Sequence, residues 1–257
     1  FNANGIDSAV TFTDGIGKAN WKVRRIAGID TVLAFLPNVD TVQFVATATV
    51  GAPSAVIKVA GDSTTVISQG SIVNLRSQVK DNFGNSISNS LVKYTVLSGS
   101  ASFAAGDSSL TDANGISTIQ VQVGNGDSAR IKATSTIPSV DTTFIVYNLV
   151  YVNATLQPNK SRRDTVVSFS VTLKNFGPHA IHLDTNQTQI RFSDGPHTYK
   201  ASLVFADSVI PGRTAAVLTF RKDSITVDFS GNSFTPRVDV KGKAALSSDS
   251  LAGTLET

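Results

Sequence analysis

Residues 73–85 read Val-Asn-Leu-Arg-Ser-Gln-Val-Lys-Asp-Asn-Phe-Gly-Asn, and this stretch decides the fold class. Val73, Leu75 and Val79 alternate with polar residues along it. Alternation with a period of two places one face of the chain on a core and the other in water, which is typical of a half-buried antiparallel strand. The stretch therefore predicts a strand that ends in a tight turn.

The turn itself has residues suited to it. The side chains of Asp81 and Asn82 can accept hydrogen bonds from the turn backbone, and Gly84 supplies a positive φ. Asp112 and Gly115 predict a second turn of the same kind. Calcium binding at module junctions is an alternative for these carboxylates, but the acidic residues are too scattered along the sequence to form a cage.

The same alternation recurs in both directions along the chain. Period-two runs occupy 92–96, 119–123 and 167–173, and no convincing stretch has apolar residues at helical spacing. Turn residues such as Asn114-Gly115 and Pro211-Gly212 punctuate these runs at the spacing of a β-sandwich. We therefore expect an all-β chain of tandem immunoglobulin-like antiparallel sandwiches.

Composition narrows the function classes. Of the 257 residues, 41% are hydrophobic and only 16% are charged, against about 25% in ordinary soluble domains. The net charge of +3 is spread along the chain, without the basic stripe that nucleic-acid binding requires. Cysteine is absent, which excludes disulfides and thiolate metal sites. No apolar run reaches the roughly 18 residues of a membrane span.

Methionine is also absent, even at position 1. We therefore expect the chain to be a processed product or a part of a longer protein.

An internal repeat sets the organisation of the chain. Thr13–Gly17 matches Thr111–Gly115, and each is followed by an alternating run. Farther along, Val39–Phe44 parallels Val140–Phe144. The spacing is about a hundred residues, the size of one immunoglobulin-like module.

The repeat predicts three regions. Residues 1–51 match only the second half of a module and need complementation, 52–148 form a complete module, and 149–257 form a divergent sandwich. Gly51-Ala-Pro53 is a candidate hinge between the first two. The second boundary has no Gly/Pro linker, and 147–151 predicts a strand that runs directly from one module into the next, which makes the joint stiff.

The motifs of the first two regions resemble a known family. Val79–Asn85, Val92-Lys-Tyr94, Thr111–Gly115 and Ala129–Ala133 together resemble the bacterial immunoglobulin-like repeats of the intimin and invasin adhesins. The last region resembles the CARDB-like accessory sandwiches of bacterial surface proteins, through its 167–173 strand, Asn175-Phe-Gly-Pro178 and Val209-Ile-Pro-Gly212. Both resemblances imply repeated extracellular modules at the cell surface that serve as stalks, spacers, fibres or adhesive tips.

Catalytic and metal-binding patterns are weak. The three histidines lie at 179, 182 and 197, and no Gly-x-Ser-x-Gly elbow accompanies them. His179 and His182 with Asp184 could form a zinc site, but strand residues three apart point to opposite faces. We therefore predict no catalytic residue, no metal and no cofactor, and a chain that is not an enzyme.

The incomplete first unit predicts an interface. Alone, residues 1–51 would expose half a core and open strand edges. The missing strands come either from an upstream part of the same protein or from another copy of the chain, by strand addition or swapping. The alternating tail at 250–257 is either a last strand or a donor. We predict the interface residues to be Trp21, Phe1, Phe12, Leu251 and Leu255; for Trp21, a place in a core is the alternative.

These features give three hypotheses for function. The first is a structural subunit or segment of a bacterial surface filament or fibre, built from immunoglobulin-like modules and assembled by strand complementation between copies. The second is the stalk of a non-polymerising adhesin of the intimin and invasin type, with a host or cell-surface receptor as partner. The third, a carbohydrate-binding accessory module, requires a row of exposed aromatic residues, and the sequence shows no such platform.

Overall fold

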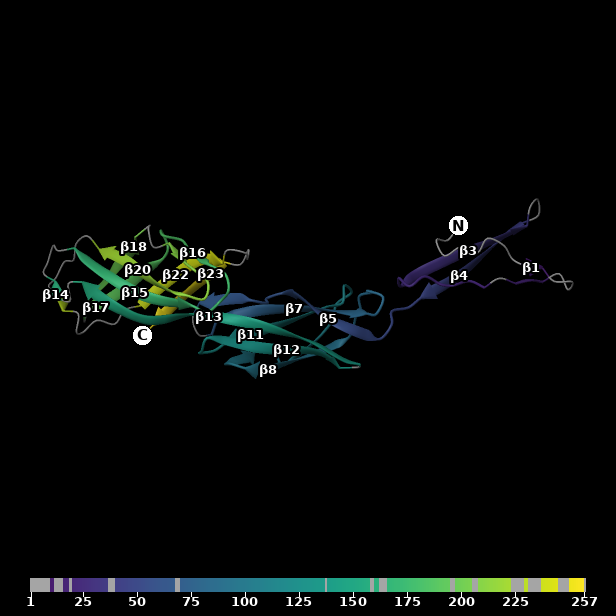
Figure 1. Ribbon diagram of the computed structural model, residues 1–257, viewed down its shortest axis with the longest axis horizontal. Helices are drawn as coiled ribbons and strands as arrows, with labels where there is room; N and C mark the ends of the chain where they lie inside the picture. The colour runs from purple at the N-terminus through teal and green to yellow at the C-terminus, as the bar shows by residue number, and fades with distance from the viewer. Residues whose placement is uncertain are drawn as a thin grey trace.

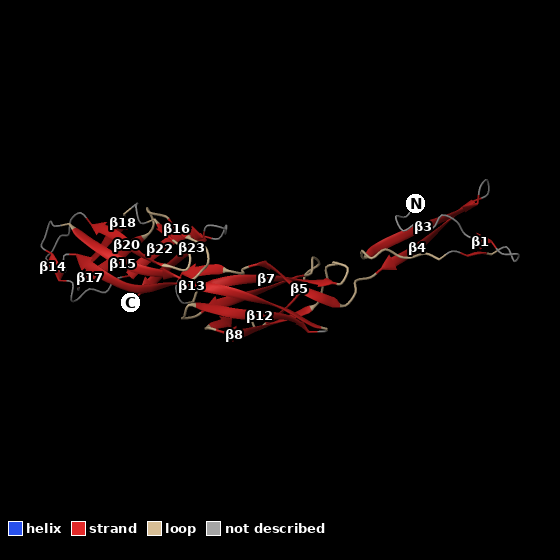
Figure 2. Ribbon diagram, viewed as in Figure 1, coloured by secondary structure: helices blue, strands red, loops and turns tan. Residues whose placement is uncertain are grey.

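The structure is a computed structural model, and it is built of β-strands throughout the part that it describes (Figures 1 and 2). It describes residues 10–11, 16–18, 20–36, 40–67, 70–136, 138–157, 160–161, 166–194, 197–204, 208–222, 229–230, 237–244 and 250–256. No helix occurs within these ranges. The predicted all-β, immunoglobulin-like fold class is therefore confirmed.

The central sandwich consists of two facing sheets. The first has the order β5–β7–β11–β9 and the second the order β10–β8–β12–β13, all with antiparallel neighbours. A further strand, β6, pairs with β13 in parallel. Their bounds are β5 Pro53–Ala60, β6 Thr64–Ile67, β7 Ile72–Asp81, β8 Leu91–Ser98, β9 Ala101–Phe103, β10 Ser108–Leu110, β11 Ile116–Val123, β12 Ser128–Thr136 and β13 Ser139–Gln157. This arrangement of strands is that of an immunoglobulin-like sandwich.

Alternation in the sequence becomes alternation of burial in this sandwich. Along β7, Leu75 and Val79 are fully buried, whereas Asn74 and Arg76, on either side of Leu75, are exposed. The buried apolar residues of the two sheets form one core: Val56, Val66, Val73, Leu75, Val79, Ile87, Val92, Tyr94, Ile119, Val121, Val123, Ala129, Ile131, Ala133, Phe144 and Val146. Each strand thus has one face on the core, as its sequence predicts.

One polar cluster crosses this core. The hydroxyl of Tyr94, on β8, lies 2.9 Å from that of Ser77 on β7 and 3.0 Å from that of Ser117 on β11. All three residues are buried. Burial raises the pKa of Tyr94, although the two serine hydrogen bonds act in the opposite direction. The cluster therefore ties one sheet to the other with satisfied hydroxyl groups.

The C-terminal sandwich begins on the same strand that ends the central one. The second part of β13 pairs with β15, β15 pairs with β20, and β20 pairs over two residues with β18. From β18 the sheet continues through β17 to β22, which also pairs with β23 and β16, and β16 pairs with β19. A separate pair is formed by β14 and β21. Their bounds are β14 Lys160–Ser161, β15 Val167–Asn175, β16 Ile181–Leu183, β17 Gln189–Asp194, β18 His197–Leu203, β19 Val209–Ile210, β20 Ala215–Lys222, β21 Phe229–Ser230, β22 Arg237–Ala244 and β23 Ser250–Glu256.

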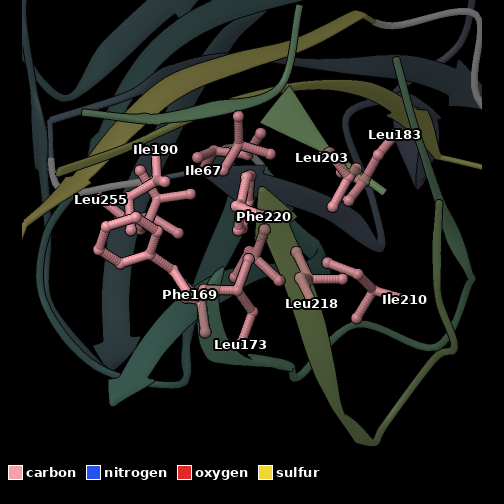
Figure 3. Close-up of a cluster of buried hydrophobic side chains, with 14 of the residues drawn as sticks. Ile67, Phe169, Leu173, Leu183, Ile190, Leu203, Ile210, Leu218, Phe220 and Leu255 are labelled. Carbon is pink, nitrogen blue, oxygen red and sulfur yellow. The ribbon is translucent and has the colours of Figure 1, made fainter. Parts of the chain in front are cut away.

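A second core fills this sandwich (Figure 3). Phe169 from β15 and Phe220 from β20 are fully buried in it, together with Ile190 from β17. The tail at 250–256 is its last strand, because β23 pairs with β22 along seven residues and Leu255 is buried in the core. The sequence left the tail either as a last strand or as a strand donated to another copy. In the structure it is the last strand of its own sandwich.

The two sandwiches share strands where they meet. β13 runs without interruption for 19 residues, first beside β12 and then beside β15. The strand predicted to continue through 147–151 is confirmed. Two adjacent residues of β6 divide between the cores: Val66 packs in the central core and Ile67 in the C-terminal one. The joint is therefore built from strands that belong to both sandwiches.

The N-terminal region is an isolated hairpin (Figure 1). β3 (Gly28–Leu36) pairs with β4 (Asp40–Ala48) along nine residues, and two-residue strands β1 (Val10–Thr11) and β2 (Gly17–Lys18) pair with each other. The alternating strand expected around Trp21 is not formed, since residues 20–27 lie outside any strand. The equivalent strand of the central sandwich, β11, lies between β7 and β9. None of the described strands of the N-terminal region pairs with residues 20–27. An alternating sequence does not form a strand without neighbouring strands to which it can hydrogen-bond.

Candidate functional site

The turn after β7 lies at the junction between the hairpin and the central sandwich. The buried carboxylate of Asp81 accepts hydrogen bonds from the backbone N–H groups of Phe83 at 2.8 Å and Asn85 at 2.9 Å. Gly84 has a φ of 85°, as predicted for this turn. The other carboxylate oxygen accepts the N–H of Gly51 at 2.9 Å and the Asn85 amide at 2.8 Å. Asp81 thus fixes its own turn and also the chain that enters β5.

These contacts determine the charge state of Asp81. Burial alone would raise its pKa, but the hydrogen bonds from the Asn85 side chain and from the backbones of Gly51, Asn85 and Phe83 outweigh burial. They lower the pKa from 3.8 to about 2. Hydrogen bonds to the ionised form favour that form. The carboxylate is therefore charged at neutral pH without a cation beside it in any described contact.

Asn85 extends the same turn toward the hairpin. Its side-chain oxygen accepts the N–H of Ala27 at 2.9 Å, and its Nδ2 donates to the carbonyl of Arg25 at 3.0 Å. The Arg25 guanidinium lies 5.6 Å from the centre of the Phe83 ring, within the range of a cation–π contact. The turn thus binds the loop that precedes β3 through both backbone and side-chain contacts.

The second junction uses the corresponding turn of the C-terminal sandwich. At the end of β15, the Asn175 side chain accepts the N–H of Gly177 at 2.9 Å and donates to the carbonyl of His179 at 2.8 Å. The next residue, Phe176, donates its N–H to the carbonyl of Asn148 on β13 at 3.2 Å. Gly177 lies directly against Thr65 of β6, so that a Cβ at position 177 would collide with the Thr65 hydroxyl. This turn therefore contacts the preceding sandwich closely.

Asn148 ties the second junction to a loop of the central sandwich. Its Nδ2 donates to the carbonyls of Gly124 at 3.0 Å and Gly126 at 2.6 Å. The loop concerned precedes β12, as the loop held by Asn85 precedes β3. The two junctions thus join the same parts of successive units.

The β3–β4 hairpin corresponds to the β12–β13 hairpin, pair by pair. Val32 lies opposite Phe44 in the first, and Ile131 lies opposite Phe144 in the second; both ladders have nine pairs. Ile131 and Phe144 are fully buried, whereas 53% of Phe44 is exposed. The face that carries Val32, Ala34 and Phe44, here called the inner face, is therefore a core face that no described sheet covers.

The opposite, outer face of the hairpin is also apolar. It carries Ile29, Leu33, Phe35 and Val45, all exposed, and 72% of Phe35 is accessible to solvent. At the positions of Leu33 and Phe35, β12 carries Lys132 and Thr134. The hairpin is thus more apolar on this face than its counterpart.

The five predicted interface residues have different outcomes in the structure. Phe1 and Phe12 lie outside the described residues. Trp21 is half-buried, and its buried Nε1 has no hydrogen-bond partner among the described groups. Leu251 lies on β23 opposite Gly242 of β22. Leu255 is only 6% exposed and contacts the core of its own sandwich, so in this structure its side chain is an intramolecular contact.

Sequence reasoning assigned Asp81 to its turn, which the hydrogen bonds confirm, but missed its contact with Gly51 and the contacts of Asn85 and Gly177 across the junctions. One sequence signal was available. Val79-Lys-Asp-Asn-Phe-Gly and Leu173-Lys-Asn-Phe-Gly are alike; the first ends β7 and the second ends β15. That likeness identifies equivalent turns in two modules of otherwise different sequence.

The second turn predicted from the sequence is present, and the remaining candidates are the possible metal ligands. Asp112 caps its own turn through the N–H groups of Asn114 and Ile116. His182 is exposed on β16 between the buried Ile181 and Leu183. Within the described ranges, no three His, Cys, Asp or Glu side chains are grouped so that they could hold a metal ion. The described part of the chain also has no helix with the length and apolarity needed to cross a membrane.

Comparison with known proteins gives likenesses of structure alone. No family model matches the sequence. No curated protein matches it either. The D0-D1 domain of intimin is similar over 80% of this chain and 98% of its own, with 12% identity and a TM-score of 0.33. The Escherichia coli adhesin FdeC is similar over 90% of this chain and 74% of its own, with 17% identity and a TM-score of 0.40. Invasin, a bacterial integrin-binding protein, shares 14% identity over 81% of this chain and 39% of its own, with a TM-score of 0.29.

Proposed function

We propose that this chain is an extracellular structural segment of a bacterial cell-surface filament or fibre. The observation that carries the proposal is the joint between the two sandwiches, where one 19-residue strand serves both and no linker intervenes. A strand with ladder partners on both sides of the boundary cannot bend there without breaking hydrogen bonds. Such a joint suits a structural segment that transmits force or keeps other domains at a fixed distance.

The proposed units are residues 1–51, 52–148 and 149–257, the last a CARDB-like accessory sandwich. The first is half of an immunoglobulin-like module and needs the other half from elsewhere. In support, the inner face of the β3–β4 hairpin corresponds to the face of β12 and β13 whose residues Ile131 and Phe144 are fully buried in the central sandwich. Exposed apolar strand faces and open edges favour association.

The partner of the hairpin has to present a particular surface. In the central sandwich, the face equivalent to the inner face packs on Leu75, Val79 and Val121 of the β5–β7–β11–β9 sheet. A single donated strand would cover only part of such a face. We therefore propose that another copy of the chain, or an upstream part of the same protein, supplies an antiparallel sheet with an apolar face. In addition to the inner face of the hairpin, we propose Trp21, Phe1, Phe12 and Leu251 as interface residues.

A second candidate function is the stalk of a non-polymerising adhesin that projects a receptor-binding tip. The directly joined sandwiches favour it as much as the filament, because a stalk also needs stiff joints. The two differ in the hairpin: a stalk takes its missing strands from its own protein, and a filament takes them from a neighbouring copy.

Electron microscopy of native material, together with sedimentation of the purified chain, tests the proposal. We expect concentration-dependent association of the purified chain and regular polymers in the native material. Thin single threads with a distinct tip would favour the stalk. A monodisperse monomer at every concentration, with a complete first module, would overturn complementation between copies.

A further inference from the structure

We infer that the turn after β7 in the central sandwich and the turn after β15 in the C-terminal sandwich are docking surfaces for the preceding module, and that they fix the orientation of one module on the next. The first such turn is Asp81–Asn85 and the second is Asn175–Pro178. The inference rests on the proposed structural function, and it identifies the surface that makes the array stiff and the segment that this surface binds.

At the first joint, the docked segment is the loop before β3 together with the chain that enters β5. Asn85 binds the loop twice, through the N–H of Ala27 and the carbonyl of Arg25. Asp81 binds the entering chain through the N–H of Gly51. Residues 27 and 51 lie on opposite ends of the hairpin sequence, so that these contacts hold both of its strands at their base.

This arrangement restrains rotation as well as distance. A single hydrogen bond leaves two bodies free to pivot about it, whereas contacts to two separate segments do not. The Arg25 guanidinium over the Phe83 ring adds a third contact on the exposed side of the turn. The hairpin makes these contacts without burying a large apolar surface, so we expect the polar contacts to determine its angle.

At the second joint, the equivalent turn packs more closely against the preceding sandwich than the first turn packs against the hairpin. Phe176 donates to Asn148, and Gly177 lies against the buried Thr65. The Lys174 ammonium lies 4.4 Å from the centre of the Phe176 ring, a counterpart within one module of the Arg25–Phe83 contact. Only a residue without a Cβ fits at position 177, because the Thr65 hydroxyl occupies the place of that atom.

The two joints have the same direction along the chain. In each, the turn after β7 or β15 of one module contacts the module before it. A surface that binds a different surface of the next unit in this way is heterologous, and repeated heterologous contacts give an open array wherever the rotation between units does not close a ring. The docking turn therefore contributes to a linear array whether the modules belong to one protein or to several copies.

The first joint is tested by a distance measurement between spin labels. The chain has no cysteine, so Thr47→Cys on β4 and Thr118→Cys on β11 provide two exposed, unique attachment sites. We expect a narrow distance distribution in the parent chain. Asn85→Ala should broaden it about twofold, since free interdomain motion is the default once specific contacts are lost. Asp112→Asn is the matched control, because it weakens a similar turn whose carboxylate has described hydrogen bonds only within its own module.

The second joint is tested by introducing a steric clash at Gly177 and then removing the clashing Thr65 hydroxyl. With labels at Thr118→Cys and the exposed Lys200→Cys, we expect Gly177→Ala to shift or broaden the distribution, and Thr65→Ala in the same chain to restore part of it. Denaturant unfolding of each variant checks that the sandwiches remain folded. Unchanged distributions in both Asn85→Ala and Gly177→Ala would overturn the inference, and equal broadening by Asp112→Asn would do so as well. Either result leaves the filament and stalk hypotheses standing, because those are decided by association and microscopy.

Discussion

At the residue scale, Asp81 carries the negative charge at the first joint. Its folded-state pKa of about 2 is below the ordinary 3.8, so the ionised carboxylate contributes stability above about pH 4. This contribution is lost as the pH falls through the folded pKa, which places the loss between about pH 4 and pH 2. Acid should therefore loosen the turn and the docked hairpin together.

The corresponding prediction concerns Asp81→Asn. The amide has nearly the shape of the carboxylate but is a weaker acceptor, so we expect a loss of about 2 kcal/mol at pH 7, as for hydrogen bonds to charged groups. Urea unfolding measured from pH 7 to pH 2 should show the difference from the parent chain shrinking toward the acid end. Asp112→Asn, which removes an exposed turn carboxylate, should cost less at pH 7. A pH-independent difference for Asp81→Asn would contradict the assigned pKa.

At the element scale, periodicity predicted strands well where both neighbours exist. The alternating run 73–79 became β7 between β5 and β11, and 167–173 became most of β15 between β13 and β20. The run around Trp21 has a similar pattern but no described strand lies beside it. A strand requires ladder partners, and a single sequence says nothing about whether they are present.

The candidate site was only partly predictable, for a related reason. The hydrogen bonds that Asp81 makes within its turn follow from local sequence, since Asp at such a position caps the backbone. Its bond to Gly51 spans 30 residues, and the Asn85 bond to Ala27 spans 58. Contacts of that kind depend on how complete modules stack, which no local pattern encodes.

The hairpin gives the prediction at this scale. Phe44 is on its inner face and Phe35 on its outer face, and both side chains are mostly exposed in the single chain. If a partner sheet covers the inner face, Phe44→Ser should weaken self-association about thirtyfold or more, because a buried aromatic anchor is worth at least about 2 kcal/mol. Phe35→Ser is the matched control and should have a smaller effect. Sedimentation equilibrium measures both, and a larger effect of Phe35→Ser would assign the interface to the outer face instead.

At the scale of the whole molecule, the two sandwiches are coupled through β6 and β13. Val66 and Ile67 are adjacent in sequence and are buried in different cores. Figure 3 shows Ile67 among the side chains of the C-terminal core. Residue 67 lies about eighty positions before the strand boundary near Leu149, yet it completes the C-terminal core. A module boundary drawn along the sequence therefore does not coincide with the division between the cores.

This sharing predicts that substitutions at neighbouring positions destabilise different sandwiches. Ile67→Ala should destabilise the C-terminal sandwich by about 2–5 kcal/mol, the usual cost of truncating a buried isoleucine. Val66→Ala should act mainly on the central sandwich, because its side chain packs there. Hydrogen exchange read by mass spectrometry distinguishes them: protection should fall first in β15 and β20 for Ile67→Ala, and in β7 and β11 for Val66→Ala. If both variants lower protection only in the central sandwich, β6 does not serve the C-terminal core, and the coupling of the two modules rests on β13 alone.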